Sequence, residues 1–481
     1  VSASQVSGSG GNLVLHDQNG NTISDATEVN IAQGGATVAK GTWDFRLTTT
    51  GTTGSQDGLY VNYGLKALDI QQDQTLTLDG TPAATDAAAD QSARITGSGN
   101  LAISTTGSDV LSLSNSGNDY TGDTTVVSGT LRTDVDGALG ATAKLAINSG
   151  TKADLNGTTQ SAGRLNTLQN GTLALNDGTL NLSQGGHVQG EITGGGQLNV
   201  NGGVLTVESV NSDMTAGVAV ADGATVRLAS PDTVLGGAGA GDVTVASGGV
   251  LAGQGLVGGN VVNSGTVSLV GNKAGNRLTV NGDYTGNAGL LVLNTVLNGD
   301  NSPTDKLTVH GDTSGNTRVD VNNVGGSGAK TVNGIELVQV DGNSAGNFAL
   351  VNGTVEAGAY VYTLAKGTGN GVKNWYLTSK WNSAVPVQDP PVVDPTAPDA
   401  LRPEAGSYIS NIATANTLFN TRLHDRLGEP QYTDALKGEG LAASMWMRHV
   451  GGHERSSAGD GQLKTQSNRY ALQLGGDIAQ W

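Results

Sequence analysis

The sequence has no cysteine, only 4% aromatic residues and only 14% charged residues, whereas 75 of its 481 residues are glycine. The absence of cysteine excludes a disulfide scaffold and any thiolate metal site. Glycine at roughly twice its usual frequency of about 7% argues against a helical bundle, because glycine is a poor helix former. No strict Gly-X-Y period is present, which excludes collagen. A thin core built from short strands is the interpretation that remains.

Positive charge is also scarce: 25 Lys and Arg stand against 42 Asp and Glu, for a net charge of −17. Because no basic patch is present, nucleic acid and anionic lipid are poor partners. No run of 18 apolar residues occurs, so no transmembrane helix is predicted. No signal peptide is visible at Val1, which fits either a processed chain or a fragment of a longer one.

Up to about Trp381, short runs of alternating apolar residues such as Leu180-Asn181-Leu182 are separated by glycine-rich turns. Gly129, Gly150 and Gly171 each precede a threonine and follow one another at intervals of 21 residues. A drifting period of about 20 residues is typical of a solenoid. Three strands and three turns per period predict one coil of a parallel β-helix, with Leu, Val and Ile pointing inward in columns.

Aromatic residues are unevenly distributed along this region. Tyr284 is the only one between Thr121 and Asn347, whereas several gather just before Trp381. A solenoid needs an atypical end that protects its last sheet edge, so residues 271–381 are predicted to form a better-packed C-terminal cap. The turn residues Asn199, Asn201 and Asn263 are predicted to form stacked amide ladders.

Proline gathers after the cap, since six of the ten prolines lie between 386 and 403. This predicts a stiff, extended linker over 382–402. A helix is predicted over 403–428, because Pro403 suits a first turn and Glu404 complements its positive end. The pattern leaves two interpretations of this helix open: it threads the water-lined lumen of a β-barrel, or it is a solvated amphipathic helix.

The last residues alternate loosely between apolar and polar. Two runs, Leu441–Val450 and Ser467–Trp481, are separated by a polar turn. This arrangement resembles a transmembrane β-hairpin. Because two strands cannot close a barrel, residues 439–481 are predicted to be the start of a truncated β-barrel.

Several motifs resemble segments of one family, the type V autotransporters of the pertactin and diffuse-adherence adhesin class. Before Ser116 the likeness is limited to the glycine-rich style of autotransporter passengers. The resemblance is carried by Asn118–Thr125 with Ser128–Leu131 (the passenger-transport repeat), by Gly299–Leu307 with Gly334–Val338 and Ala357–Tyr362 with Asn374–Leu377 (the autochaperone region), and by Arg422–Leu427 and Trp446–Trp481 (the α-linker and the translocator barrel).

The resemblance implies an all-β fold, namely a right-handed parallel β-helix followed by a linker helix and the first strands of an outer-membrane β-barrel. It implies that the cap folds first, outside the cell, and templates the rest. The implied domains are a passenger over 1–270, an autochaperone cap over 271–381, a Pro-rich linker over 382–402, an α-helical linker over 403–428 and the truncated translocator barrel over 439–481.

The function that the resemblance implies is that of an adhesin secreted through its own C-terminal barrel. Its passenger would be displayed on the surface of a Gram-negative bacterium and would mediate cell–cell aggregation or attachment to host cells or matrix. The implied partners are copies of itself on neighbouring cells, host surface or matrix molecules, and the outer membrane through the barrel. Nucleic acid is not among them.

No catalytic, cofactor-binding or metal-binding residue is predicted, and the chain is interpreted as a non-enzyme. The Gly-Asp-Ser-Gly and Gly-Asp-Ser-Leu motifs of enzymatic passengers are absent. The alternative left open is a β-helix enzyme acting on polysaccharide, which needs clustered Asp beside Arg or Lys on one strand face. Most Asp residues neighbour glycine in predicted turns, so two or three carboxylates converging in a groove would be needed to favour the enzyme.

Overall fold

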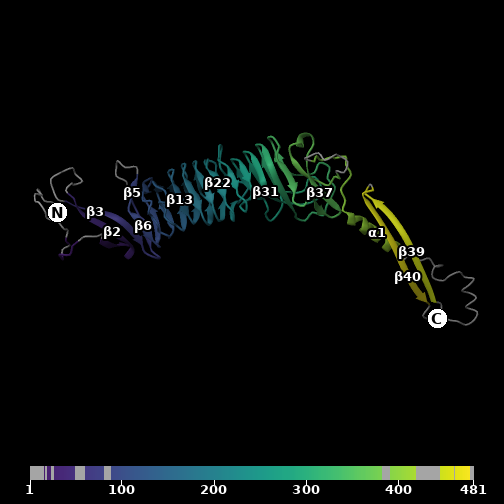
Figure 1. Cartoon of the computed structure of the whole chain (residues 1–481), viewed down its shortest axis with the longest axis horizontal. Coiled ribbons are helices and arrows are strands. Elements are labelled where there is room, and N and C mark those ends of the chain that lie inside the picture. The colour runs from purple at the N-terminus through teal and green to yellow at the C-terminus, as the bar shows by residue number, and fades with distance from the viewer. Residues whose placement is uncertain are drawn as a thin grey trace, which may run out of the picture. The chain divides into compact units, whose positions relative to one another are not determined.

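The structure is a computed structural model that describes residues 16, 19–22, 27–48, 60–80, 88–381, 391–418, 445–459 and 461–476 (Figure 1). The chain divides into two compact units. The first comprises residues 1–294, 304–322 and 337–349, and the second comprises residues 295–303, 323–336 and 350–481. The domain bounds expected from the sequence stay predictions.

The first unit begins with antiparallel strands, which differ from the parallel coils expected from residue 1 onward. Strands β1 (Thr27–Gln33), β2 (Ala36–Thr48) and β3 (Tyr60–Ile70) pair antiparallel, and β3 then pairs parallel with β6 (Arg94–Gly97). Antiparallel pairing here joins segments that are neighbours in sequence, whereas a parallel coil needs a long connection.

The side chain of Gln33 links these antiparallel strands to the edge of the first coil. Its Nε2 donates to the backbone oxygen of Thr77 at 2.7 Å, and the backbone N–H of Thr77 donates to its Oε1 at 2.8 Å. One amide side chain therefore satisfies both backbone groups of Thr77, a residue of β4 (Thr75–Leu78) that would otherwise lie on an open edge.

After these strands the chain winds into coils whose strands stack as parallel ladders on three faces (Figure 1). The first face consists of β4, β7 (Asn100–Ser104), β9 (Thr124–Ser128), β11 (Lys144–Ile147), β14 (Arg164–Thr167), β17 (Gly185–Val188), β20 (Gly203–Val207), β23 (Ala224–Leu228), β26 (Val250–Gly253), β29 (Thr266–Ser268) and the second half of β31 (Tyr284–Thr295).

The second and third faces are built in the same way. The second consists of β13 (Thr159–Ala162), β16 (Thr179–Leu182), β19 (Gln197–Val200), β22 (Gly217–Val220), β25 (Val243–Val245), β28 (Val261–Asn263) and the first half of β31, with β33 (Thr313–Asn323) and β35 (Asn347–Leu350) following in the same sheet. The third consists of β5 (Ala89–Gln91), β8 (Val110–Leu113), β10 (Thr130–Thr133), β12 (Lys152–Asp154), β15 (Thr172–Ala174) and β18 (Glu191–Thr193), and then of β21 (Val210–Asn211), β24 (Val234–Leu235), β27 (Gly255–Val257), β30 (Arg277–Val280), β32 (Lys306–Val309) and β34 (Ile335–Val340).

The predicted inward columns are confirmed by the register of the second face. Leu180, Leu198, Val218, Val243 and Val261 are partners in successive coils, and each is at most 2% exposed. Successive strands lie about 4.8 Å apart, so each apolar side chain rests on the one below it. The core is thus a stack in which every coil buries its neighbours.

The predicted amide ladder is present at Asn199 and absent at Asn263. Asn199 Nδ2 donates to Oδ1 of Asn181 in the preceding coil at 2.8 Å. Asn263 is instead fully buried, and its Nδ2 donates to the hydroxyl of Tyr284 at 3.0 Å. Asn201, the third predicted position, is exposed.

A second ladder recurs at the corner where a glycine precedes an Asx residue. Asp283 Oδ1 accepts a hydrogen bond from the backbone N–H of Asp312 at 2.8 Å, and Asp312 Oδ1 accepts one from Asn343 at 2.7 Å. A Cβ atom at Gly311 would overlap Asp283 Oδ1, and one at Gly342 would overlap Asp312 Oδ1. Each glycine therefore leaves room for the carboxylate of the coil before it.

The second unit contains the antiparallel strands β36 (Val355–Ala357), β37 (Tyr360–Lys366) and β38 (Trp375–Thr378), with a short 3₁₀-helix, η1 (Gly369–Gly371), between the last two. Residues 391–402, part of the stiff, extended linker predicted over 382–402, hydrogen-bond to these strands. Residues 382–390 of that prediction lie outside the described residues.

The predicted helix begins at the expected residue: α1 spans Pro403–Leu418, with Glu404 in its first turn. Its predicted end near Gly428 lies outside the described residues. Among the helices that are described, none is long and apolar enough to cross a membrane. An antiparallel hairpin follows, formed by β39 (Met445–Ala458) and β40 (Leu463–Gly476), with both strands longer on the turn side than predicted.

The Gly-Asx ladder gives a first prediction. Gly311→Ala should destabilise the chain by about 1–3 kcal/mol, because the methyl group overpacks against Asp283. Gly64→Ala is the matched control, since Gly64 has open space around its Cβ position, and it should change stability by less than about 0.5 kcal/mol. Urea unfolding of both variants measures this, and equal midpoints would contradict the role of Gly311.

Candidate functional site

The C-terminal region of the first unit contains a buried aromatic pair. Tyr284 is fully buried, and its ring stacks on Phe348 with the centroids 5.9 Å apart. The Tyr284 hydroxyl accepts a hydrogen bond from Asn263 and lies 3.4 Å from the Oγ1 of Thr317. Burial raises the pKa of this hydroxyl, so Tyr284 stays neutral and acts as a packing residue with a satisfied polar end.

The second unit buries its own aromatic residues. Trp375 is fully buried, with the ammonium of Lys366 5.5 Å from the ring centroid. Burial lowers the pKa of Lys366, as expected for an ammonium withdrawn from water. The Tyr362 hydroxyl accepts a hydrogen bond from the backbone N–H of Ala329 at 2.9 Å, which ties a distant loop to β37. Large aromatic side chains are therefore buried in each unit, and the single cap predicted over 271–381 stays a prediction.

Two aspartates that are close in sequence each accept hydrogen bonds from three backbone N–H groups. Asp305, which is fully buried, accepts hydrogen bonds from Gly275, Asn276 and Asn294, each at 2.8 Å. Asp300 in the second unit accepts hydrogen bonds from three consecutive residues, Val332, Asn333 and Gly334, at 2.8–3.0 Å. The sequence of 299–307 resembles the autochaperone region, but these two hydrogen-bonding roles were not predicted from it. The available signal was an acidic residue directly before the alternating run Lys306–Val309.

Two opposing effects act on the pKa of the Asp305 carboxyl group. Burial raises the pKa of its carboxyl group, and the three backbone N–H donors lower it by stabilising the charged form. Burial is the larger effect, so the net pKa lies above the usual value for aspartate. This carboxylate joins the loop before β30, the end of β31 and the start of β32.

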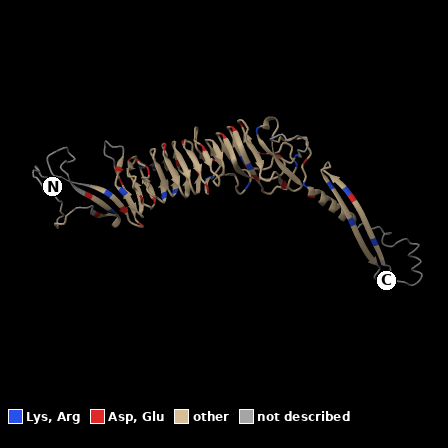
Figure 2. Cartoon of the chain, in the orientation of Figure 1, with Lys and Arg blue, Asp and Glu red and all other residues tan. Residues whose placement is uncertain are grey.

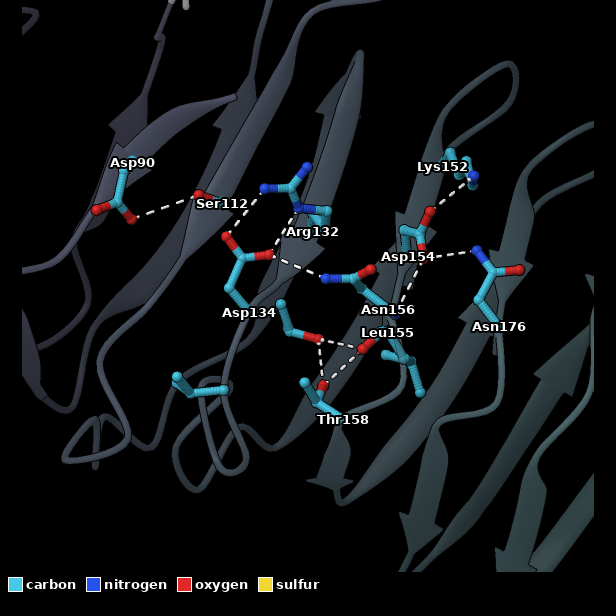
Figure 3. Close-up of polar contacts among 12 residues, drawn as sticks. Asp90, Ser112, Arg132, Asp134, Lys152, Asp154, Leu155, Asn156, Thr158 and Asn176 are labelled. Atoms are coloured by element: carbon cyan, nitrogen blue, oxygen red, sulfur yellow. Dashed lines mark hydrogen bonds and ion pairs between the residues drawn. The ribbon is translucent and has the colours of Figure 1, made fainter. Parts of the chain in front are cut away.

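The third face carries a group of paired charged side chains (Figure 3). Arg132 on β10 pairs with Asp134, with Nε 2.6 Å from Oδ1, and Lys152 on β12 pairs with Asp154 at 2.8 Å. Asn156 and Asn176 donate further hydrogen bonds to the two carboxylates, and Asp90 accepts one from Ser112. The hydrogen bond from the Arg132 guanidinium holds the pKa of Asp134 below its usual range.

This group bears on the polysaccharide-enzyme alternative. It brings Asp beside Arg and Lys on one strand face, as that chemistry requires, but each cation is paired with a carboxylate. An Asp134 carboxyl kept ionised is unsuited to act as a general acid. The group therefore resembles a solvated ion-pair network more than a catalytic pair.

A cavity of about 330 Å³ lies between the antiparallel strands and the first coils. Asp79 and Asp90 are among its lining residues, but leucines make up much of the rest and no Arg or Lys contributes to the lining. Neither this cavity nor the ion-pair network combines converging carboxylates, a free cation and a groove. Within the described residues, no group of three or more His, Asp or Glu side chains is arranged to hold a metal ion.

Taken together, the parallel coils, the aromatic clusters and the hairpin after α1 define a β-solenoid with a packed C-terminal region. A family model described as Autochaperone Domain Type 1 matches residues 259–364, which include Tyr284, Phe348 and Tyr362 but not Trp375. This match agrees with the autochaperone resemblance seen in the sequence.

The chain is also similar to curated proteins of Escherichia coli. It is 72% identical to YdeU of strain K12 over 217 residues, covering 44% of this chain and 47% of YdeU. It is 38% identical to YuaQ of the same strain over 614 residues, covering 100% of this chain and 44% of YuaQ. It is 41% identical to the autotransporter adhesin AIDA-I over 208 residues, covering 43% of this chain and 15% of AIDA-I.

The autochaperone match and the similarity to AIDA-I support the assignment of this chain to the type V autotransporters. These similarities indicate a location at the outer membrane or the cell surface of a Gram-negative bacterium. The chain spans less than half of the length of the curated relatives named above.

Asp305 gives the second prediction. Asp305→Asn should lower the free energy of unfolding at neutral pH by about 1–3 kcal/mol. Its side-chain NH₂ group would replace one carboxylate oxygen and would face a backbone N–H that now donates a hydrogen bond to that oxygen. The exposed Asp213→Asn is the control and should have little effect.

The pH dependence of the same pair is a further check. Since folding raises the pKa of Asp305, the contribution of this group is largest below its unfolded pKa of about 3.9. This contribution to stability decreases as pH rises through the pKa of the folded state. The stability of Asp305→Asn should not show that decrease. Urea unfolding between about pH 3 and pH 7 measures it, and parallel curves for the two proteins would refute the assignment.

Proposed function

We propose that the chain is a surface-displayed adhesin that mediates aggregation or attachment, with folding that starts at residues 271–381. The observation that carries the proposal is a solenoid of parallel coils with an outward row largely of Ser, Asn and Thr on its second face, in a chain similar to the adhesin AIDA-I. An enzyme acting on polysaccharide is the second candidate, favoured only by the Asp-rich third face.

The second face offers the row best suited to contact with another copy of the chain. From β13 to the first half of β31, its central outward row contains no charged side chain, whereas the first and third faces carry Arg227, Arg132 and Asp154 at outward positions. Figure 2 marks the charged residues along the chain. Two rods that each carry a net charge of −17 repel least where neither presents a charge. The row consists of Ser161, Asn181, Asn199, Ala219, Thr244, Val262 and Thr285.

Contact along such a row would consist of many weak interactions. Each hydrogen bond between hydroxyl or amide groups contributes about 1 kcal/mol net, so no single position dominates. Many displayed copies on two cells can engage together, and this multivalency makes weak contacts useful. Copies on neighbouring cells are therefore the proposed first partner, with host surface or matrix molecules as the alternative.

We also propose that α1 and the β39–β40 hairpin are the linker helix and the first strands of the outer-membrane translocator. One face of the hairpin exposes Met447 opposite Leu474, with Tyr470 and Leu472 beside them, although His449 lies opposite Leu472 on the same face. This face suits contact with lipid. The opposite face carries Arg469, whose Nη1 donates to Thr417 Oγ1 of α1 at 3.1 Å, which supports the lumen interpretation of the helix.

The third prediction tests the proposed start of folding. Trp375→Ala should lower the amount of passenger on the cell surface more than Leu198→Ala does. Either change costs about 3–5 kcal/mol of packing energy, but only the first falls on the proposed nucleus. Surface labelling of cells producing the full-length protein measures both, and equal surface levels would refute the nucleus.

The fourth prediction tests the uncharged row. Thr244→Asp should slow the settling of cells that display the protein, and added salt should partly restore settling, because the new charges repel and are screened within about 8 Å at physiological salt. Thr206→Asp places the same charge on the first face and should settle like wild type. Equal settling of the two variants would argue against the row, and no settling or host binding by wild type would favour the enzyme.

A further inference from the structure

The proline-rich segment after the cap is partly built into it. Residues 391–402, here called the strap, lie against the ends of β37 and β38 in the second unit. A turn divides the strap into two legs, in which Asp394 Oδ1 accepts hydrogen bonds from the backbone N–H and the hydroxyl of Thr396 at 2.9 and 2.7 Å. The segment whose composition predicts a stiff, extended linker therefore contains a defined turn.

The first leg binds the end of β37. The Lys366 N–H donates to the Pro391 oxygen at 2.8 Å, and the Val393 N–H donates back to the Lys366 oxygen at 2.7 Å. Proline has no N–H to donate, but its carbonyl oxygen accepts normally, so Pro391 supplies the acceptor of this leg and Val393 supplies the donor. The Val393 side chain is 3% exposed, so the leg is packed as well as bonded.

The second leg binds both neighbouring strands. Ala400 donates to the Ser379 oxygen at 2.6 Å and accepts from the Val361 N–H at 3.1 Å. Lys380 and Asp399 form an ion pair at 3.0 Å, with the lysine side chain only 12% exposed. The leg ends where the Arg402 N–H donates to the Ala359 oxygen at 2.9 Å.

We propose that the strap is the closing element of the cap, so that the folding unit at the C-terminus extends through Arg402 and past the family match at residue 364. Without the strap, the backbone groups of Lys366, Ser379 and Val361 would lie on open strand ends. With it, these groups are satisfied by a segment that cannot continue the sheet, because its prolines lack N–H groups.

The strap also couples the cap to the helix. Arg402 is hydrogen-bonded in the cap, and Pro403 is the first residue of α1, so no free residue separates them. This step rests on the proposed secretion through the outer membrane: if α1 occupies the translocator, the cap can close only after the strap has left it. Docking of the strap would then occur only once the chain up to Arg402 has left the translocator.

Hydrogen exchange on the purified chain tests the strap without reference to secretion. The amides of Val393, Ala400 and Arg402 should exchange about 100-fold or more slowly than those of an unstructured peptide, as do amides within β37. Exchange of these three amides at the unstructured rate, with β37 protected, would overturn the proposal.

A matched pair of variants tests the consequence. Ala400→Asp places a charge at a position only 3% exposed, whereas Pro395→Asp places it at an exposed position of the turn. Ala400→Asp should abolish protection of the strap, speed proteolysis of β37 and lower surface display, and Pro395→Asp should behave as wild type.

The outcomes separate the strap from the proposed function. Loss of protection in Ala400→Asp with display at the wild-type level would overturn the coupling to secretion. Failure of the wild-type protein to reach the surface, with the strap protected, would instead count against the secretion route and leave the strap as the closing element. Equal protection in the two variants would overturn the strap itself.

Discussion

Pairing of backbone groups between successive coils is the interaction on which the rest of the structure depends. Each strand of the three faces satisfies its N–H and C=O groups through the strands of the coils on either side. The same regularity leaves unsatisfied groups wherever the stack stops. At the start, Gln33 supplies both partners of Thr77. In the second unit, the strap supplies the partners of Lys366 and Ser379.

Regular stacking also dictates where glycine and Asx residues recur. A side chain at a coil corner lies above the same corner of the next coil, so a polar side chain there meets a backbone N–H. Asp283 and Asp312 accept such hydrogen bonds, and Gly311 leaves the space for the first of them. The high glycine content is therefore in part a packing requirement of the corners. It is not only a sign of flexible turns, because these positions hold fixed hydrogen bonds.

The sequence was sufficient for features that repeat and insufficient for features that occur once. The inward columns, the Asn181–Asn199 contact and the start of α1 follow from periodicity and helix-start chemistry. Asn263 looked like another ladder residue, yet it turns inward because one Tyr284 hydroxyl lies in the core beside it. The buried Asp305 and the docked strap depend on long-range pairing that composition does not encode, since proline-rich segments suit both free linkers and strand edges.

The aspartates described above are bonded within the fold. Asp305 and Asp300, which are buried or half-buried, accept hydrogen bonds from backbone N–H groups, and Asp134 and Asp154 are paired with cations on the third face. Carboxylates that are already bonded in this way are poorly placed to attack or protonate a substrate. The outward row of the second face combines Ser, Asn and Thr with Ala219 and Val262, and several of its polar groups bond to the neighbouring coil. Asn199 is bonded to Asn181, and the Thr285 hydroxyl lies 3.0 Å from that of Ser314. Along this row, as at the corners, polar side chains join one coil to the next.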